Sequence, residues 1–124
     1  MLINNKVKAF VPIKDQTKAK MFYQDQLGLN LLSEDPYGLE FDLGGSVLRL
    51  SMVESHQPAQ YTILGWKVSD IYAEMTELGA RGIIFEQFSM QNQDERGVWD
   101  APDGTKVASF KDPFGNVLSL DQKK

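Results

Sequence analysis

VPIKD at residues 11–15 and WKVSD at residues 66–70 are the most informative stretches of this 124-residue chain. Each reads as the end of a β-strand followed by an aspartate, and each leads into an amphipathic stretch that ends in Leu-Gly, at 27–28 and at 78–79. An aspartate accepts hydrogen bonds from the free amides of a first helical turn, and glycine supplies the left-handed residue that ends a helix. The same strand–helix unit therefore occurs twice, about half a chain apart.

Eight segments outside these two predicted helices have the residue pattern of β-strands. They are residues 7–13, 29–33, 39–43, 47–52, 62–68, 83–86, 106–111 and 117–121. The order is strand, helix and three strands, and then the same again. The sequence thus predicts an α+β fold of two βαβββ modules, at about 5–54 and 60–122, within one domain that covers 1–124. Residues 87–97 form the longest stretch without a predicted element, which is either a lid or a solvated loop.

Alternation along the strands gives each predicted sheet two different faces. One face is apolar and should lie under the helices, because an amphipathic helix needs an apolar sheet surface to cover. It comprises Ala9, Val11, Ile13, Leu48, Leu50, Met52, Leu64, Trp66, Val68, Leu118 and Leu120. The opposite face, the mixed face, comprises Lys8, Phe10, Pro12, Val47, Arg49, Ser51, Ile63, Gly65, Lys67, Val117, Ser119 and Asp121. The mixed face either meets solvent or lines a cup.

The composition limits the classes of function. With 42% hydrophobic and 24% charged residues, the chain is typical of one soluble globular domain. A net charge of −4 without a basic run argues against a nucleic-acid partner. No run of about 18 apolar residues is present, so we expect no membrane role and a cytoplasmic protein. The chain has no cysteine and one histidine, His56, which argues against disulfides, thiol nucleophiles and imidazole-rich metal sites.

Three features together resemble the vicinal oxygen chelate superfamily, which contains glyoxalase I, the bleomycin resistance proteins, fosfomycin resistance enzymes and extradiol dioxygenases. They are the doubled module, Phe22-Tyr23 before the first Leu-Gly, and FKDPFGN at residues 110–116. The resemblance spans almost the whole chain. It implies that the sheets roll into a cup with the helices on its outer face. It also implies that the chain is a homodimer, as many small relatives are, and that enzymes of the group hold a divalent metal at the cup floor.

The resemblance places the family's metal ligands at Lys8, Arg49, Ile63 and Ser119 of this sequence. A protonated lysine and an arginine have no lone pair for a metal, and isoleucine offers no donor. We therefore expect no metal centre and no cofactor. Glyoxalase and dioxygenase chemistry depends on the metal, so these activities are disfavoured. The bleomycin resistance proteins are the family precedent for a metal-free cup that binds a ligand.

The predicted function is metal-independent binding of a small molecule, anionic or aromatic, and the sequence leaves open whether a reaction is catalysed. The candidate ligand-binding residues are Arg49, Phe10, Trp99, Lys8, Ile63 and Ser119. Arg49 either clamps a carboxylate or phosphate, or pairs with Glu40 or Asp121 and holds strands together. Phe10 and Ile63 would supply apolar walls. Trp99 either stacks over a ligand or plugs the edge of the core.

Two alternatives stay open beside ligand binding. One is a lyase, isomerase or dioxygenase-like enzyme of the same superfamily that uses Asp121 or Glu40 for acid–base chemistry. The other is a non-enzymatic subunit whose cup is filled by its own side chains and which presents a surface to a protein partner.

Overall fold

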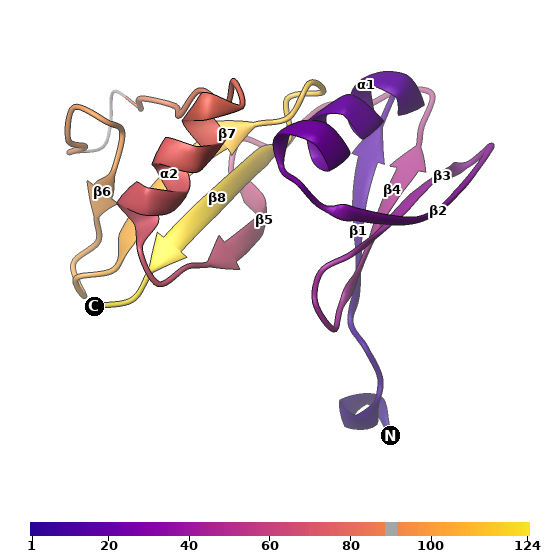
Figure 1. Ribbon diagram of the computed structural model, residues 1–124, viewed down its shortest axis with the longest axis horizontal. Coiled ribbons are helices and arrows are strands. Elements are labelled where there is room, and N and C mark those ends of the chain that lie inside the picture. Colours follow the sequence, from indigo (N-terminus) through magenta and orange to yellow (C-terminus); the bar gives the residue numbers. More distant parts are fainter. Residues whose placement is uncertain (89–91) are drawn as a thin grey trace. The chain divides into compact units, whose positions relative to one another are not determined.

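Two four-stranded sheets, each formed by one half of the chain, are the framework of the computed structural model, which describes residues 1–88 and 92–124 (Figure 1). The chain divides into unit 1, Met1–Gln57, and unit 2, Pro58–Lys124. Each unit has the order strand, helix and three strands, so the predicted α+β repeat of two βαβββ modules is confirmed.

Unit 1 contains η1 (Leu2–Asn4), β1 (Lys8–Ile13), α1 (Gln16–Lys20), η2 (Met21–Gln26), β2 (Asn30–Asp35), β3 (Gly38–Asp42) and β4 (Val47–Met52). Its sheet has the order β1-β4-β3-β2, with β1 parallel to β4 and the other pairs antiparallel. The edge strands are therefore β1 and β2.

The first helix lies where the sequence predicts it, but its second half is wider than an α-helix. Asp15 caps α1, because its Oδ1 accepts a hydrogen bond from the Lys18 amide at 2.9 Å. The helix then continues as η2, a π-helix, whose end is marked by a bond from the Leu27 amide to the Phe22 carbonyl. Tyr23 is buried on η2, and its ring lies 6.2 Å from that of Phe41 on β3.

Unit 2 contains β5 (Thr62–Lys67), α2 (Ile71–Ala80), β6 (Trp99–Asp100), β7 (Lys106–Lys111) and β8 (Val117–Gln122). The sheet order is β5-β8-β7-β6, with β5 parallel to β8, which repeats the topology of unit 1. Asp70 caps α2 through a bond from the Ala73 amide at 3.1 Å.

The strand predicted at residues 83–86 is wrong. Of these residues only Phe85 pairs, as an isolated bridge to Phe110, and the Glu86 amide donates to the Ser109 carbonyl at 2.8 Å. The other end of β7 pairs with β6, a strand that the sequence analysis did not predict. The reason is local: the Ile83 amide is still bonded to the end of α2, so the segment reaches only one end of β7.

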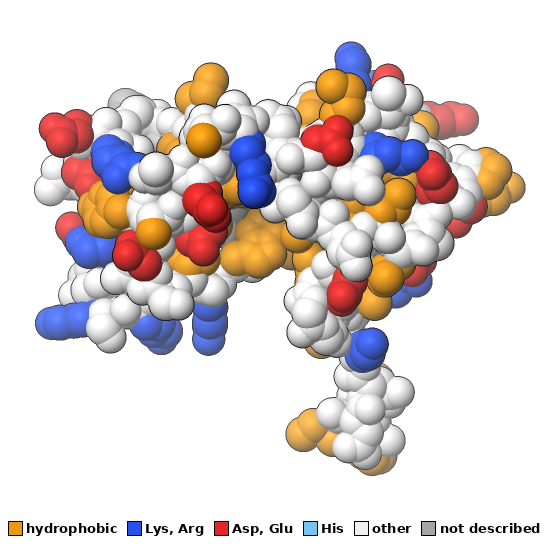
Figure 2. Space-filling view, viewed as in Figure 1, with side chains coloured by type: hydrophobic (Ala, Val, Ile, Leu, Met, Phe, Trp, Pro, Cys, Tyr) orange, Lys and Arg blue, Asp and Glu red, His pale blue; other side chains and the backbone are white. Residues whose placement is uncertain are grey.

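The predicted apolar face is confirmed as the core-facing side of each sheet. Its buried members are Val11, Ile13, Leu48, Leu50, Leu118 and Leu120. Ala9, Leu64, Trp66 and Val68 are half-buried, whereas Met52, at the end of β4, is exposed. Figure 2 shows Lys and Arg side chains interspersed with Asp and Glu over the outward surfaces of α1 and α2. Among the residues described, no helix has the length and apolar character needed to cross a membrane.

Candidate functional site

The mixed face of unit 1 brings three predicted site residues together. The register pairs Phe10 with Arg49 and Arg49 with Glu40, so these residues form a row across β1, β4 and β3. Directly paired residues point to the same side of a sheet. Lys8 lies two residues before Phe10 on the same strand and therefore on the same face.

An ion-pair network links the charged members of this face. Glu40 Oε2 lies 3.1 Å from Lys8 Nζ and 3.4 Å from Arg49 Nη1. Asp35 binds the same guanidinium with both oxygens, at 3.1 Å from Nη1 and 3.2 Å from Nη2. The hydrogen bond from Arg49 is the main reason that the pKa of Asp35 lies below its ordinary value of 3.8, and Asp35 in turn raises the pKa of Arg49.

Asp35 is the main partner of Arg49, and sequence reasoning missed it. It lies at the end of β2, in the turn DPYG at 35–38, where its Oδ1 also accepts a bond from the Tyr37 amide at 2.7 Å. Gly38 makes the arrangement possible, because a Cβ there would lie 2.0 Å from the Leu50 carbonyl oxygen and 3.2 Å from the Arg49 guanidinium carbon. The sequence feature that could have drawn attention to Asp35 is the similarity of this turn to DPFG at 112–115.

The accessible groups on this face are Lys8 and Phe10. The side chain of Arg49 is only 14% exposed, whereas that of Lys8 is 46% exposed. Phe10 is 65% exposed, and the Lys8 ammonium lies 5.7 Å from the centre of its ring. An incoming molecule would therefore meet an aromatic ring and an ammonium group before it met the guanidinium.

On the mixed face of unit 2, the row equivalent to Phe10, Arg49 and Glu40 has small, uncharged side chains. Gly65 pairs with Ser119, and Ser119 pairs with Ser109. Ser119 is 6% exposed, and a Cβ at Gly65 would lie 2.9 Å from its hydroxyl oxygen. Ile63 lies at an irregularity in the pairing of β5 with β8 and is 37% exposed.

Trp99 lies on the mixed face of unit 2, near its edge. It pairs with Val107 on β7, and Val107 pairs with Asp121 on β8, so the three side chains share that face. Trp99 is half-buried. Its position on β6 is thus compatible with stacking on a ligand, and it does not lie on the core-facing side.

The positions that the family resemblance assigns to a metal do not fit a divalent cation. In unit 1 they hold an ammonium and a guanidinium, each already donating to Glu40. In unit 2 they hold Ile63 and Ser119. No group of three or more His, Asp or Glu side chains able to hold a metal occurs within residues 1–88 and 92–124.

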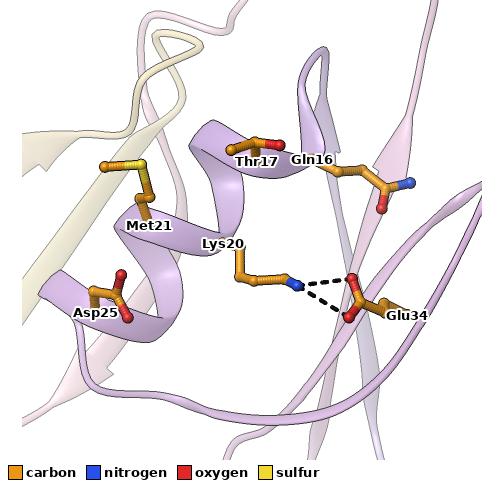
Figure 3. Close-up of a pocket in the computed structure, with 6 residues that line it drawn as sticks. All are labelled: Gln16, Thr17, Lys20, Met21, Asp25 and Glu34. Atoms are coloured by element: carbon orange, nitrogen blue, oxygen red, sulfur yellow. Dashed lines mark hydrogen bonds and ion pairs between the residues drawn. The ribbon is translucent and has the colours of Figure 1, made fainter.

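A hollow of about 250 Å³ lies on the other side of the unit 1 sheet, between the first helix and β2 (Figure 3). It is lined by Gln16, Thr17, Lys20, Met21, Asp25 and Glu34. Lys20 Nζ bridges both Glu34 oxygens, at 3.0 and 2.9 Å, and so closes one side. None of the six predicted ligand-binding residues lines this hollow.

Solved structures with the same fold come from several bacteria. A glyoxalase/bleomycin resistance protein/dioxygenase from Alicyclobacillus acidocaldarius is 20% identical, with a TM-score of 0.75 over 97% of this chain and 92% of that one. TioX from Micromonospora sp. ML1 is 16% identical, with a TM-score of 0.72 over 97% and 99%. Lactoylglutathione lyase from Agrobacterium tumefaciens is 18% identical, with a TM-score of 0.72 over 94% and 91%. At these identities the similarity establishes the fold alone.

A sequence comparison with curated proteins gives no match. The sequence model of the Glyoxalase/Bleomycin resistance protein/Dioxygenase superfamily, in contrast, matches residues 7–120. That range includes both βαβββ modules except the last two residues of β8, and it includes the closing turn at 112–116. The chain therefore belongs to the glyoxalase/bleomycin resistance protein/dioxygenase superfamily.

Proposed function

We propose that the chain binds a small planar molecule with an anionic group on the mixed face of unit 1, without a metal. The observation that carries the proposal is the uncovered ring of Phe10 beside the Lys8 ammonium, 5.7 Å from the ring centre. A phenylalanine left in water forgoes roughly 1.5–3 kcal/mol of burial free energy. A ligand that covers the ring recovers part of it.

The two cations of this face have different roles in the proposal. Among the residues that the structure describes, Lys8 pairs with one acidic side chain, that of Glu40, and Lys8 is accessible, so an incoming carboxylate can replace or join that partner. Exposed ion pairs contribute little to stability, so such an exchange costs little. Arg49 is held by Asp35 and Glu40 and acts as a positioning residue that keeps Glu40 in place.

The predicted ligand-binding residues of unit 2 would belong to a second, separate surface. Trp99 offers a second aromatic ring on the mixed face of its own sheet, and Ile63 is an accessible residue of β5. Ser119 is buried, so we assign it a structural role there. We also propose that the protein is a homodimer, which sedimentation velocity tests directly.

The binding test is a calorimetric titration of the purified protein. The panel contains benzoate-type carboxylates, their neutral amides and a glycopeptide antibiotic of the bleomycin type. We expect a carboxylate to bind better than its amide, and Lys8→Gln to weaken binding about tenfold, which is about 1.4 kcal/mol. Phe10→Ala should weaken the binding of both the carboxylate and its amide. Lys6→Gln, a change at an exposed lysine just before β1, is the matched control.

Two results would overturn the proposal. One is the absence of binding by every compound in the panel. The other is equal binding by the parent, Lys8→Gln and Phe10→Ala. Stoichiometric zinc, nickel or iron retained after gentle purification would favour the enzymatic alternative, because such a metal would need ligands that the proposal does not include.

A further inference from the structure

Four side chains that the proposed ligand site does not use connect residues 92–98 to helix α2. The Tyr72 hydroxyl donates to Asp94 Oδ2 at 2.5 Å. The Arg96 guanidinium carbon lies 5.2 Å from the centre of the Tyr72 ring, and its Nη2 donates to Thr76 Oγ1 at 3.1 Å. Tyr72 and Thr76 are four residues apart on α2 and so lie on one face of the helix.

The second oxygen of Asp94 organises the backbone that follows. Oδ1 accepts bonds from the Arg96 and Val98 amides, both at 2.9 Å. The Asp94 amide donates in turn to the Val98 carbonyl at 2.8 Å. Val98 is thereby held by both its amide and its carbonyl, and its side chain is buried.

This anchoring determines which way Trp99 points. Side chains alternate between the two sides of a strand, so a buried Val98 places its neighbour Trp99 on the mixed face. The strand that carries Trp99 has only two residues, Trp99–Asp100, which is too short to fix its own position. Gln93 adds a bridge to Trp99 and donates from Nε2 to the Gly97 and Glu86 carbonyls at 2.7 and 3.1 Å.

We propose that Tyr72, Asp94 and Arg96 form a latch that holds Trp99 on the mixed face of unit 2. Its three members are positioning residues, since the contacts that the structure describes for them reach Trp99 through the backbone of residues 94–98. The latch stands on these contacts alone, and it can be tested without any ligand. Its consequence is that α2, on one side of the sheet, sets the position of an aromatic ring on the other side.

Limited proteolysis and fluorescence test the latch together. Trypsin can cut the Arg96–Gly97 bond only after this segment opens locally. Tyr72→Phe removes the hydroxyl but keeps the ring under Arg96. It should raise cleavage at this bond about tenfold, the size expected for losing a hydrogen bond to a charged group. In a Trp66→Phe background, which leaves Trp99 as the sole tryptophan, the same change should shift emission to longer wavelength.

Matched variants keep the test decisive. Tyr61→Phe removes a hydroxyl from an exposed tyrosine of the same unit and should change neither readout. If Tyr72→Phe lowers the folded fraction, as judged by far-ultraviolet circular dichroism, Asp94→Asn is measured in its place. Unchanged cleavage and emission in a folded variant would overturn the latch. A rise in cleavage that is equal after Arg96 and after Lys111 would also overturn it, since that pattern indicates general destabilisation.

Discussion

The two units share one topology but differ in the row of residues at the centre of the mixed face. The equivalent rows are Phe10, Arg49 and Glu40 in unit 1, and Gly65, Ser119 and Ser109 in unit 2. One row is large and charged, and the other is small and neutral. The core-facing residues, in contrast, are apolar in both units. The comparison indicates that the core-facing side maintains the fold, whereas the mixed face is free to diverge for function.

The turns that close two of the hairpins differ in the same way. Asp35 of DPYG and Asp112 of DPFG each accept a bond from the amide two residues later, at 2.7 and 2.9 Å. The second oxygen of Asp112 accepts from the Asn116 side chain at 2.8 Å, so that carboxylate is used within its own turn. Asp35 instead binds Arg49 across the sheet face. Both aspartates therefore bind groups of their own turn, and Asp35 also binds an arginine of the candidate site.

The largest expected effect is a loss of stability caused by substitutions on the core-facing side of each sheet, which is apolar in both units. Leu48 and Leu118 occupy equivalent positions on β4 and β8, and both are fully buried. Leu48→Ala and Leu118→Ala should each lower the free energy of unfolding by about 3 kcal/mol, because each removes buried methyl groups and leaves a cavity. Urea denaturation measures both. A loss confined to one of the two would contradict the equivalence of the core-facing sides.

A smaller effect on stability should distinguish the mixed face of unit 1 from that of unit 2. Arg49→Gln leaves Asp35 and Glu40 without their guanidinium and should cost about 1 kcal/mol at low ionic strength. This loss of stability should be smaller in 1 M salt, because the Debye screening length is then roughly 3 Å. Ser119→Ala removes a neutral group, so its cost should not depend on salt. The measurement is urea denaturation at two salt concentrations, and equal salt dependence would contradict the assignment.

The sequence predicted those parts of the fold that depend on neighbouring residues. The helix caps Asp15 and Asp70 and the alternation of strand side chains are local features, and the structure confirms them. The π-helical turn of η2 and the two-residue strand β6 depend on contacts with the rest of the unit. Propensity along the chain did not reveal either element.

The sequence predicted that Lys8, Phe10 and Arg49 share one sheet face, but it did not predict all of the contacts between the side chains of that face. Lys8, Phe10 and Arg49 were assigned to one face, and the register places them there. Glu40 was one of two expected partners of Arg49, and it lies 3.4 Å from it. Asp35 escaped prediction because its contact depends on how closely Gly38 lets two strands approach. Such a distance follows from packing rather than from local pattern.

A weaker effect on stability is expected at Gly65, the position in unit 2 that is equivalent to Phe10. A Cβ there would lie 2.9 Å from the Ser119 hydroxyl oxygen, which can rotate away, and 3.2 Å from the Ser119 carbonyl oxygen. Gly65→Ala should therefore cost less than about 1 kcal/mol, and its cost should fall in a Ser119→Ala background. A double-mutant cycle read by thermal unfolding measures the coupling. Full additivity would contradict this contact.

The smallest effect concerns the protonation of Asp35. Its pKa is below 3.8 in the folded chain, chiefly because Arg49 donates to the carboxylate. A lowered pKa means that this carboxylate stabilises the fold above the ordinary value, and that the contribution is lost as the pH falls through the folded value. Carbon-13 NMR of the side-chain carboxyl should place the midpoint of Asp35 below 3.8 in the parent and higher in Arg49→Gln.

Asp103 provides the matched control within the same titration. Its pKa is also below 3.8, but there the first cause is a hydrogen bond from the Thr105 backbone rather than an arginine. Arg49→Gln should leave the Asp103 midpoint in place while that of Asp35 rises. If both midpoints moved together, the change would reflect the charge of the whole protein. If neither moved, the turn amide of Tyr37 would suffice to explain Asp35, and the guanidinium would be a neighbour of that carboxylate without governing its protonation.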